Sequence, residues 1–415
     1  QTYGAGSTVK LGLLRQGNPV EMSAKLIETS KPLSGQGGKG GGKAGGGKGG
    51  GAPLTLWKKS VFRVAVIGIE YTDVKHNAKV SNQDWADSIF SKGTYFKKKN
   101  PTGQDVHGSL NDYFLEQSGG ALRIEGKVFD WVNVGKKRGD YIQGNGTGGG
   151  NKTLVLSDAL SKLTSRDGKD ALKEIDGYIF IYAGDRYKTN AGAIYYPHAG
   201  TVQQTPYVLT SEGTSTMASV NSFAKIACQA LGLPDLAARP DQSASRSLGS
   251  WCILSNPISN GRPQGMNPWA KEKLGWTKPI VIDPSQPQKL ILSPIEDSPK
   301  ECIKVLVRPN GSEYYLLENR RKKGFDSDLP GEGLLIWRVV NDRPLLCESH
   351  GIDSPKAPDL NTKAVPFPSE NNSAFTPDTV PSSRSPHGGG LPVHITQIQR
   401  LPDGRIIFSI GYEYR

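Results

Sequence analysis

Long apolar runs are missing from this chain of 415 residues. None approaches the roughly 20 residues that a membrane-spanning helix needs. The longest run near the start of the fold, residues 64–69, has the length of a strand. We therefore expect no transmembrane segment. The chain also lacks any pattern typical of a nucleic-acid-binding motif, so we expect no nucleic-acid partner.

Cysteine is scarce, with four residues in the whole chain. An even count in an exported protein is compatible with two disulfides, which allow three connectivities. The sequence begins at Gln1 and not at Met. A mature N-terminus left after removal of a signal peptide is the simple interpretation, although an engineered start would look the same. We expect a secreted or extracytoplasmic protein, in the periplasm or on the cell surface.

Basic residues outnumber acidic ones, 51 to 39, and the formal net charge is +12. A well-solvated basic surface is the simpler interpretation of this excess. The functional interpretation is attraction to an acidic partner, such as an anionic polysaccharide, a cell surface or an acidic protein.

The N-terminal region does not look like a domain. Residues 1–34 form an arm in which residues 9–14 suggest a strand and residues 22–27 a helical turn. Residues 35–53 are rich in glycine and lysine, with twelve glycines between positions 35 and 51. Such a run has high backbone entropy and little to bury, so it predicts a flexible linker unless a partner surface orders it.

Two differently patterned regions follow, and they predict two domains. In residues 54–285, strand and helix patterns alternate, which is typical of a layered α/β domain. The predicted strands are residues 61–71, 122–134 and 178–182, and the predicted helices begin at a capping box of Ser81 with Asp84, at residue 110 and near residue 156.

Residues 286–415 contain short strands separated by turn signals, which predict an all-β sandwich. The predicted strands are residues 289–293, 303–308, 314–319, 334–339, 393–399 and 405–412. A long stretch rich in proline, serine and asparagine, residues 345–392, is expected to be an extended surface loop or a mobile segment.

Several segments, in a shared order, resemble those of the secreted metzincin-type metalloproteases related to immune inhibitor A. The resemblance runs from about residue 62 to residue 412. It is carried by residues 62–77, 109–122, 178–200, 267–276, 316–320, 329–337, 366–368 and 381–386, and by A-L-G-L-P-D-L at 230–236. It implies an α/β (α+β) metzincin-like zinc-protease fold followed by the β-sandwich.

The resemblance also implies where the metal site would lie. In the family, H-E-x-x-H supplies two zinc-binding histidines and a catalytic glutamate. Those positions fall on Lys225, Gln229 and Ile226. The third ligand position falls on Asp235, which keeps a carboxylate, and Leu254 replaces the methionine of the turn beneath the metal.

These replacements predict a site without zinc and without peptidase chemistry. A lysine ammonium has no lone pair for a metal, and an amide oxygen is a poor zinc ligand. We expect no bound cofactor. Asp235 could cap a turn or form an ion pair with Lys225; both interpretations stay open.

Two further kinds of site are considered. Cys228 and Cys252 lie in segments that meet around the metal in the family, so the resemblance suggests a Cys228–Cys252 disulfide, leaving Cys302–Cys347 as the second bridge. Buried free thiols are the alternative. Structural calcium could involve Asp326 with Asp328, or Asp353 with Asp359, although solvated loop carboxylates explain both pairs.

The sequence predicts a non-catalytic metalloprotease homologue that acts as a structural or binding subunit of an extracytoplasmic assembly, with a protein partner or with copies of itself. One alternative is an active secreted metallopeptidase or hydrolase with atypical site residues, for example a Lys225 nucleophile assisted by Ser250. Another is a decoy that binds peptides without cutting them.

Overall fold

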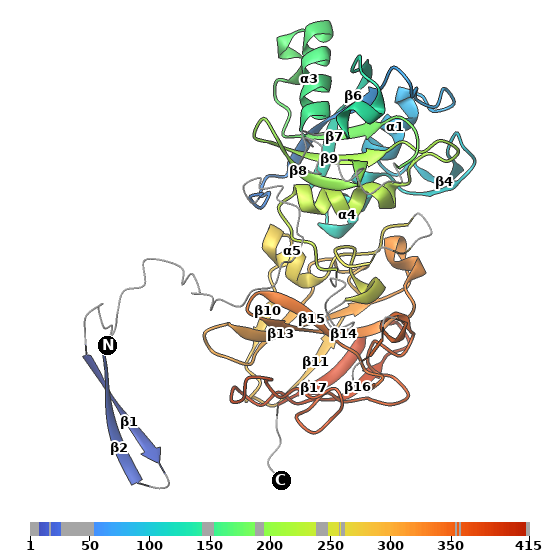
Figure 1. The fold of residues 1–415 in the computed structure, drawn as a ribbon. Coiled ribbons are helices and arrows are strands. Elements are labelled where there is room, and N and C mark those ends of the chain that lie inside the picture. Colours follow the sequence, from blue (N-terminus) through green and yellow to red (C-terminus); the bar gives the residue numbers. More distant parts are fainter. Residues whose placement is uncertain are drawn as a thin grey trace. The chain divides into compact units, whose positions relative to one another are not determined.

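The computed structural model describes residues 8–15, 18–25, 54–142, 153–186, 195–237, 248–256, 258, 262–352, 355–356 and 358–411. By its internal contacts the chain divides into two units, residues 1–49 and residues 50–415 (Figure 1). The mixed α/β content agrees with the expectation from the sequence.

The described residues of the first unit form a β-hairpin. Strands β1 (Thr8–Arg15) and β2 (Asn18–Lys25) pair antiparallel, with Arg15 opposite Asn18 at the turn. The strand expected over residues 9–14 is present. The prediction of a helical turn over residues 22–27 is wrong for residues 22–25, because these residues belong to β2 and pair with β1. The predicted linker at 35–53 lies outside the described residues.

A five-stranded sheet in the order β6-β3-β7-β9-β8 organises the first half of the second unit. Its strands are β3 (Val61–Glu70), β6 (Arg123–Asn133), β7 (Gly177–Tyr182), β8 (His198–Val202) and β9 (Thr205–Ser211). The first four strands in this order are parallel, whereas β8 is antiparallel to β9 and lies at the edge. The continuous apolar runs of β3 and β7 fit strands that are buried on both faces.

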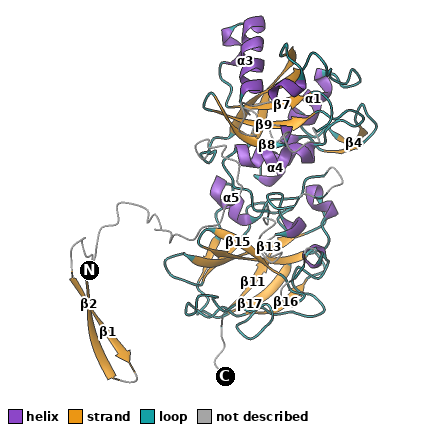
Figure 2. Ribbon diagram, viewed as in Figure 1, coloured by secondary structure: helices purple, strands orange, loops and turns teal. Residues whose placement is uncertain are grey.

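Helices cover both faces of this sheet (Figure 2). The helices are α1 (Asn82–Phe90), α2 (Leu110–Gln117), α3 (Leu154–Asp167) and α4 (Val220–Ala230). One hydrophobic cluster joins Val64 and Val66 of β3 to α1, α2 and α4, and another joins Ala65 and Ile67 to α3. Because side chains alternate along a strand, one strand supplies both layers.

Local capping sets the beginning of two helices. Ser81 accepts a hydrogen bond from the Asp84 amide, and the Asp84 carboxylate accepts one from the Ser81 amide. Ser109 and Asp112 form the same reciprocal box at the start of α2. These boxes satisfy amide groups that a helix leaves without internal partners. The box predicted at Ser81 is confirmed.

The second half contains α5 (Pro268–Leu274) and two further sheets. The five-stranded sheet has the order β10-β12-β13-β14-β15, and the three-stranded sheet has the order β11-β17-β16. Their bounds are β10 (Ile280–Ile282), β11 (Gln288–Leu292), β12 (Ile303–Leu306), β13 (Glu313–Arg320), β14 (Gly333–Val340), β15 (Arg343–Cys347), β16 (Ile395–Arg400) and β17 (Ile406–Ile410).

Residues from both of these sheets share one hydrophobic cluster that includes Leu317, Ile336 and Phe408. All six strands predicted here are present. Two were missed, β10 and β15, because β10 is three residues long and β15 lies at the start of the stretch that was expected to be irregular. Across the predicted domain boundary at 285/286, β10 pairs with β12.

Short elements complete the description. Strands β4 (Phe96–Lys99) and β5 (Asp105–His107) pair antiparallel. Single-turn 3-10 helices lie at Arg138–Tyr141, Lys169–Leu172, Gly249–Trp251, Gly324–Asp328 and Asp359–Asn361. Among the described residues, no helix is long and apolar enough to span a bilayer.

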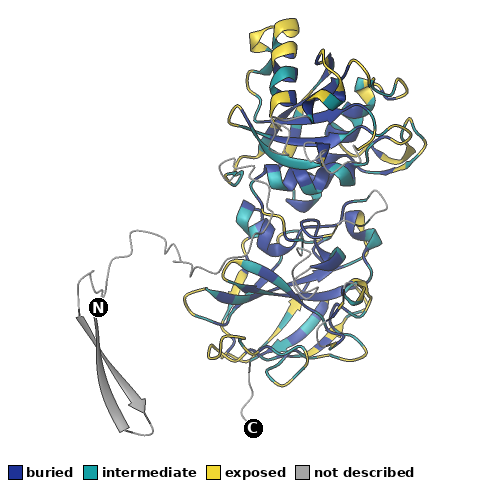
Figure 3. Ribbon diagram, viewed as in Figure 1, coloured by how far each residue is buried: buried dark blue, intermediate teal, exposed yellow. Residues whose placement is uncertain are grey.

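The core is continuous between the two halves of the second unit. The cluster beneath α4 includes Trp251 of the loop after it, Trp269 of α5, and Trp337 of β14. Buried segments occur in both halves of this unit (Figure 3). Segments on either side of the predicted boundary therefore bury surface against each other.

Candidate functional site: the α4 helix and the segments around it

Helix α4 carries the positions at which the sequence analysis expected the remains of a metal site. Its buried face, which includes Phe223, Ala224 and Ala227, packs on the sheet. Lys225 and Gln229 are four residues apart and therefore share one side of the helix. Ile226, at the position of the expected glutamate, is 7% exposed and belongs to the hydrophobic core.

After α4 the chain turns sharply at Gly232, whose φ is +92°. A Cβ atom there would lie 2.6 Å from the Thr55 carbonyl oxygen. Only glycine therefore fits both the backbone conformation and the close approach. This turn brings Asp235 back towards the helix.

Lys225 and Asp235 form an ion pair, with Nζ 3.0 Å from Oδ1. The Lys225 ammonium also donates to the Ser255 carbonyl oxygen at 2.8 Å. Asp235 Oδ1 accepts a hydrogen bond from the Ala237 amide at 2.9 Å. Both roles that the sequence left open for Asp235, pairing and turn capping, are present together.

The loop that the family resemblance places beneath the metal contacts this region directly. The Leu236 amide donates to the Leu254 carbonyl oxygen at 2.9 Å, and Leu254 is fully buried. Trp251 is also fully buried, and its indole nitrogen donates to the Leu360 carbonyl oxygen at 2.8 Å. This loop is therefore held between α4 and the C-terminal half.

A pocket of about 380 Å³ opens beside the ion pair. Its lining consists of Leu54, Ala199, Gln229, Gly232, Leu233, Pro234 and Asp235. Ala199 belongs to β8, which has β9 on one side and lies at the edge of its sheet. An edge strand beside a pocket is the geometry that accepts an extended peptide by strand addition.

The residues present do not fit zinc. Lys225 places a cation, already paired and hydrogen-bonded, where the first histidine would lie. Gln229 offers only an amide, and one carboxylate cannot replace the three protein ligands typical of such a site. Among the described residues, no group of three or more His, Cys, Asp or Glu side chains is placed to hold a metal.

A Lys225–Ser250 pair, considered for a hydrolase, is not assembled. Lys225 bonds Asp235 and Ser255, whereas the Ser250 hydroxyl donates to the Asn361 side chain at 2.8 Å. The two side chains therefore have different partners.

The aspartates considered for calcium have protein partners. Asp326 accepts hydrogen bonds from Arg320 and the Gly265 amide, and Asp328 lies 2.9 Å from Arg262. Asp359 accepts from the Lys356 amide at 2.8 Å. Asp353 lies outside the described residues. Nothing in the geometry of the described aspartates indicates a calcium site.

The structure contains neither predicted disulfide: all four cysteines are free and buried. Cys302 directly precedes β12, whereas Cys347 ends β15, with β13 and β14 between them. Three strand spacings amount to roughly 14 Å, well beyond the Cα separation of a disulfide.

Cys228 and Cys252 do share one hydrophobic cluster, as the resemblance suggested. Cys228 Sγ, however, lies 4.0 Å from Met266 Sδ, and both thiols act as small buried apolar groups. Burial raises the pKa of the Cys252 thiol to about 11 and raises that of Cys228 further.

The carboxyl edge of the five-stranded sheet holds a cluster that the sequence analysis missed. Glu70 ends β3 and bonds the His76 ring, which stacks on Trp131 at 4.7 Å. Burial alone would raise the pKa of Glu70, but hydrogen bonds from His76 and Lys75 lower it. Glu70 is the last residue of the buried parallel strand β3, and Glu212 directly follows the parallel strand β9. Their positions at the carboxyl ends of these strands were the available signal in the sequence.

Glu212 is the second carboxylate of this edge. Both of its oxygens accept from the Asn77 amide at 3.0 Å. Burial raises its pKa to about 7, although hydrogen bonds from Asn77 and Gly184 oppose the shift. The cluster is a polar site of its own, on a different element from α4.

A second missed feature is a buried ionic cluster centred on Arg320, at the end of β13. Arg320 is fully buried; its guanidinium lies 2.6 Å from Asp326, 3.2 Å from Glu318 and 3.7 Å from Glu296. Burial alone would lower the pKa of Arg320, but Asp326 and Glu318 raise it.

The Arg320 cluster also reaches the elements around α4. Arg320 Nη1 donates to the Trp251 carbonyl oxygen at 3.4 Å, and Asp326 accepts from the Gly265 amide at 2.7 Å. Glu116 of α2 accepts from the Phe325 amide at 3.2 Å. Burial, together with the Asp326 charge, raises the pKa of Glu116 to about 7. These contacts fix the loop that lies beneath the candidate site.

Comparison with known proteins finds one family match, within the first half of the second unit. Residues 58–214 match the family model described as immune inhibitor A peptidase M6, catalytic domain. The match includes β3, α1, α2 and β9 and ends before α4, so it does not include Lys225, Gln229 or Asp235. No curated protein matches the chain.

Proposed function

Because residues 58–214 match the family model of the immune inhibitor A peptidase M6 catalytic domain, we propose that the chain is a member of this family that has lost peptidase activity and acts as a binding or structural subunit. The residues on α4 that would perform the chemistry are replaced by residues that cannot.

The Lys225–Asp235 ion pair carries this proposal. An ammonium group lies where a metal ligand would be needed, and it balances the charge of the remaining carboxylate. Ile226 provides no carboxylate to take a proton from water. A site with this composition has no general base on α4 and no set of ligands that could polarise a substrate carbonyl.

The surface around the ion pair supports binding. An extended peptide could form backbone hydrogen bonds with the edge strand β8 on one side. On its other side it would face the open pocket of about 380 Å³. Without a catalytic group on α4, a peptide bound there would be held and not cleaved. The partner is therefore proposed to be a protein segment, from another chain or from another copy.

The proposed location is extracytoplasmic. Immune inhibitor A peptidases are secreted, and the described residues contain no membrane-spanning helix. The net charge of +12 favours association with an acidic surface or polysaccharide there. The N-terminal arm and linker are the first candidates for subunit contacts, so deleting residues 1–52 should weaken assembly in sedimentation measurements; unchanged assembly contradicts that assignment.

Metal content tests the central proposal. Purified protein, dialysed without chelator, should contain zinc well below one equivalent and should not cleave a general protease substrate. The matched variant is the triple substitution Lys225→His, Ile226→Glu and Gln229→His, which supplies the missing groups on the same helix and should raise the zinc content. Zinc near one equivalent in the wild-type protein, or metal-dependent cleavage by it, contradicts the proposal.

A further inference from the structure

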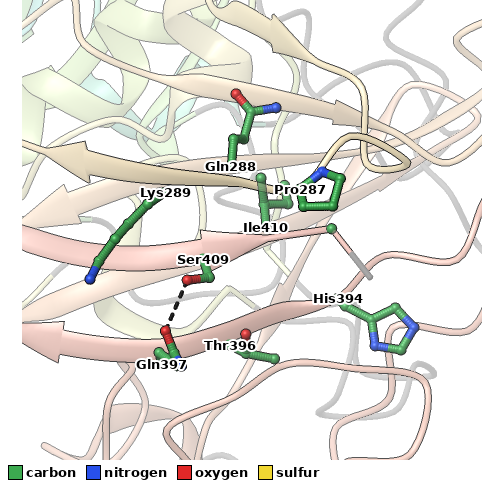
Figure 4. Close-up of a pocket in the computed structure, with 9 residues that line it drawn as sticks. Pro287, Gln288, Lys289, His394, Thr396, Gln397, Ser409 and Ile410 are labelled. Atoms are coloured by element: carbon green, nitrogen blue, oxygen red, sulfur yellow. Dashed lines mark hydrogen bonds between the residues drawn. The ribbon is translucent and has the colours of Figure 1, made fainter. Parts of the chain in front are cut away.

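A second pocket lies on the three-stranded sheet of the C-terminal half, on elements other than those around α4. Its volume is about 480 Å³. Figure 4 shows its lining, which comes from β11, β17, β16 and the segments next to them: Pro287, Gln288, Lys289, His394, Thr396, Gln397, Ser409, Ile410 and Gly411. The family match does not include these residues, and the proposed peptide-binding site lies on other elements.

A row of polar side chains crosses the floor of this pocket. Lys289 of β11 pairs with Ser409 of β17, and Ser409 pairs with Thr396 of β16. Directly paired residues of neighbouring strands point to the same face. The adjacent residues Ile410 and Ile395 belong to the hydrophobic core, so the row faces away from the core. One ammonium and two hydroxyl groups therefore lie side by side.

An irregularity in β16 adds an amide to the row. The register between β16 and β17 shifts between Thr396 and Gln399, and Gln397 has a φ of +53°. The Ser409 hydroxyl donates to Gln397 Oε1 at 3.0 Å (Figure 4). This bond orients the Gln397 side chain over the sheet and leaves its NH₂ group as a donor. A β-bulge that re-aims a side chain is a frequent feature of binding surfaces.

The end of the pocket is closed by tightly packed backbone. The Gly411 amide donates to the His394 carbonyl oxygen at 3.0 Å. A Cβ atom at Gly411, whose φ is +103°, would lie 2.7 Å from the Pro287 Cα. The His394 ring forms part of the rim beside this contact. Rigid elements with close backbone packing give the recess a defined shape.

The positive charge of the pocket lining favours an anionic ligand. Lys289 is its one residue with a permanent charge, and none of the nine lining residues carries a carboxylate. The remaining polar groups are hydroxyls, amides and an imidazole, which suit the hydroxyl groups of a sugar ring. We propose that this pocket binds an anionic saccharide, with the sugar carboxylate on Lys289 and the ring hydroxyls on Thr396, Gln397 and Ser409.

The proposal gives the excess positive charge of the chain a specific role. A net charge of +12 would attract an acidic polysaccharide from solution, and the pocket would bind one uronate unit of it. The paired hydroxyl and amide groups provide the specificity that a surface lysine alone does not.

Binding of a short galacturonate oligomer to the full chain tests the proposal. Calorimetric titration should detect binding, and the same oligomer with its carboxylates methyl-esterified should bind at least roughly tenfold more weakly, because a hydrogen bond between charged groups is replaced by a neutral contact. Lys289→Gln should weaken binding of the acidic oligomer by a similar factor. Thr396→Val should also weaken it, without changing the preference for the acid.

The matched control is Lys278→Gln, because Lys278 is also exposed but does not line the pocket. It should keep the wild-type affinity. Equal weakening by Lys278→Gln and Lys289→Gln would mean that the net charge alone attracts the oligomer, and it would overturn the proposal. So would equal binding of the esterified oligomer, or no binding by the wild-type protein at millimolar ligand. Melting temperatures of all variants check that each is folded.

Discussion

Two charged regions of this protein differ in how far water reaches them. At the candidate site, Lys225 is 18% exposed and Asp235 is 55% exposed, and they form one ion pair beside an open pocket. At the Arg320 cluster, a fully buried guanidinium contacts three carboxylates, and Lys271 is buried nearby. The first region is accessible to a ligand, and the second is not.

This difference gives a physical reason for the proposed loss of peptidase activity. An exposed ion pair contributes little to stability, so residue types there can be replaced at small cost. A buried charge that loses its partner is strongly destabilising. The Arg320 cluster bonds the loop at Trp251 and the segment at Gly265. The same loop bonds the Leu236 amide through the Leu254 carbonyl oxygen. Burial therefore restricts which residue types the Arg320 cluster can contain, whereas the accessible positions of the candidate site are not restricted in this way.

The largest effect is expected for Arg320→Met. Removing the guanidinium leaves the buried carboxylates of Glu318 and Asp326 without their cation, which should lower the free energy of unfolding by about 3–5 kcal/mol in urea denaturation. Arg321→Met, at the neighbouring half-buried position, should cost less than about 1 kcal/mol. The double variant Arg320→Met with Asp326→Leu should recover part of the loss. Equal effects of the two single variants would contradict the comparison.

A smaller, pH-dependent effect is expected at Glu116. Its pKa is raised in the folded state to about 7 from an ordinary value of 4.5. Folding then binds a proton, so its contribution to stability is fully present below pH 4.5 and is lost as pH rises through about 7. The Glu116→Gln variant should therefore gain on the order of 2 kcal/mol relative to wild type between pH 5 and pH 8.

The control for this pH dependence is Glu370→Gln, at an exposed position. Denaturation at several pH values measures the difference between each variant and the wild type. If the Glu116→Gln difference is flat across this range, Glu116 is ionised throughout and the cluster is less shielded than we infer.

A weak effect is expected at the candidate site. Lys225→Met should lower the free energy of unfolding by no more than about 1 kcal/mol, because the pair with Asp235 is half-exposed and screened by water. The coupling energy from a double-mutant cycle with Asp235→Asn should be a few tenths of a kcal/mol and should shrink in salt. A loss as large as that of Arg320→Met would mean that the two regions are equally constrained.

The smallest effect is expected from reduction. Since all four cysteines are free, a thiol reductant should leave the melting temperature unchanged. A disulfide between α4 and the loop at Cys252 would be worth roughly 2–4 kcal/mol and would make the candidate site a covalently fixed region. A thiol reagent should react only after unfolding, because burial raises the pKa of Cys347 to about 12 and that of Cys252 to about 11. A fall in melting temperature on reduction contradicts the free-thiol assignment.

Local patterns were sufficient for most elements. The capping box at Ser81, the alternation of strand and helix, and the turn-bounded strands after residue 286 all depend on residues close in sequence. The predictions failed where the deciding contact is distant. Strand β15 pairs with β14 although it contains Pro344, and Met22 lies in a hairpin strand and not in a helical turn.

Some features of the candidate site could likewise be predicted from local sequence, and others could not. The prediction that Lys225 and Gln229 occupy the two histidine positions came directly from a sequence motif. The choice between a capping and a pairing role for Asp235 could not, because it depends on the turn at Gly232. The Arg320 cluster was also invisible, since Arg320, Glu296 and Asp326 are brought together by sheet geometry and by a loop, and no periodic pattern marks them.

The sequence alone determined the mixed α/β architecture, the resemblance to a peptidase family and the absence of the expected histidine and glutamate side chains on α4. The tertiary structure decided which charges are buried together, which cysteines are too far apart to bond, and where pockets open beside polar rows such as Lys289, Ser409 and Thr396. The physical reason is that secondary structure follows short-range periodicity, whereas burial and charge pairing depend on which distant segments the fold brings into contact.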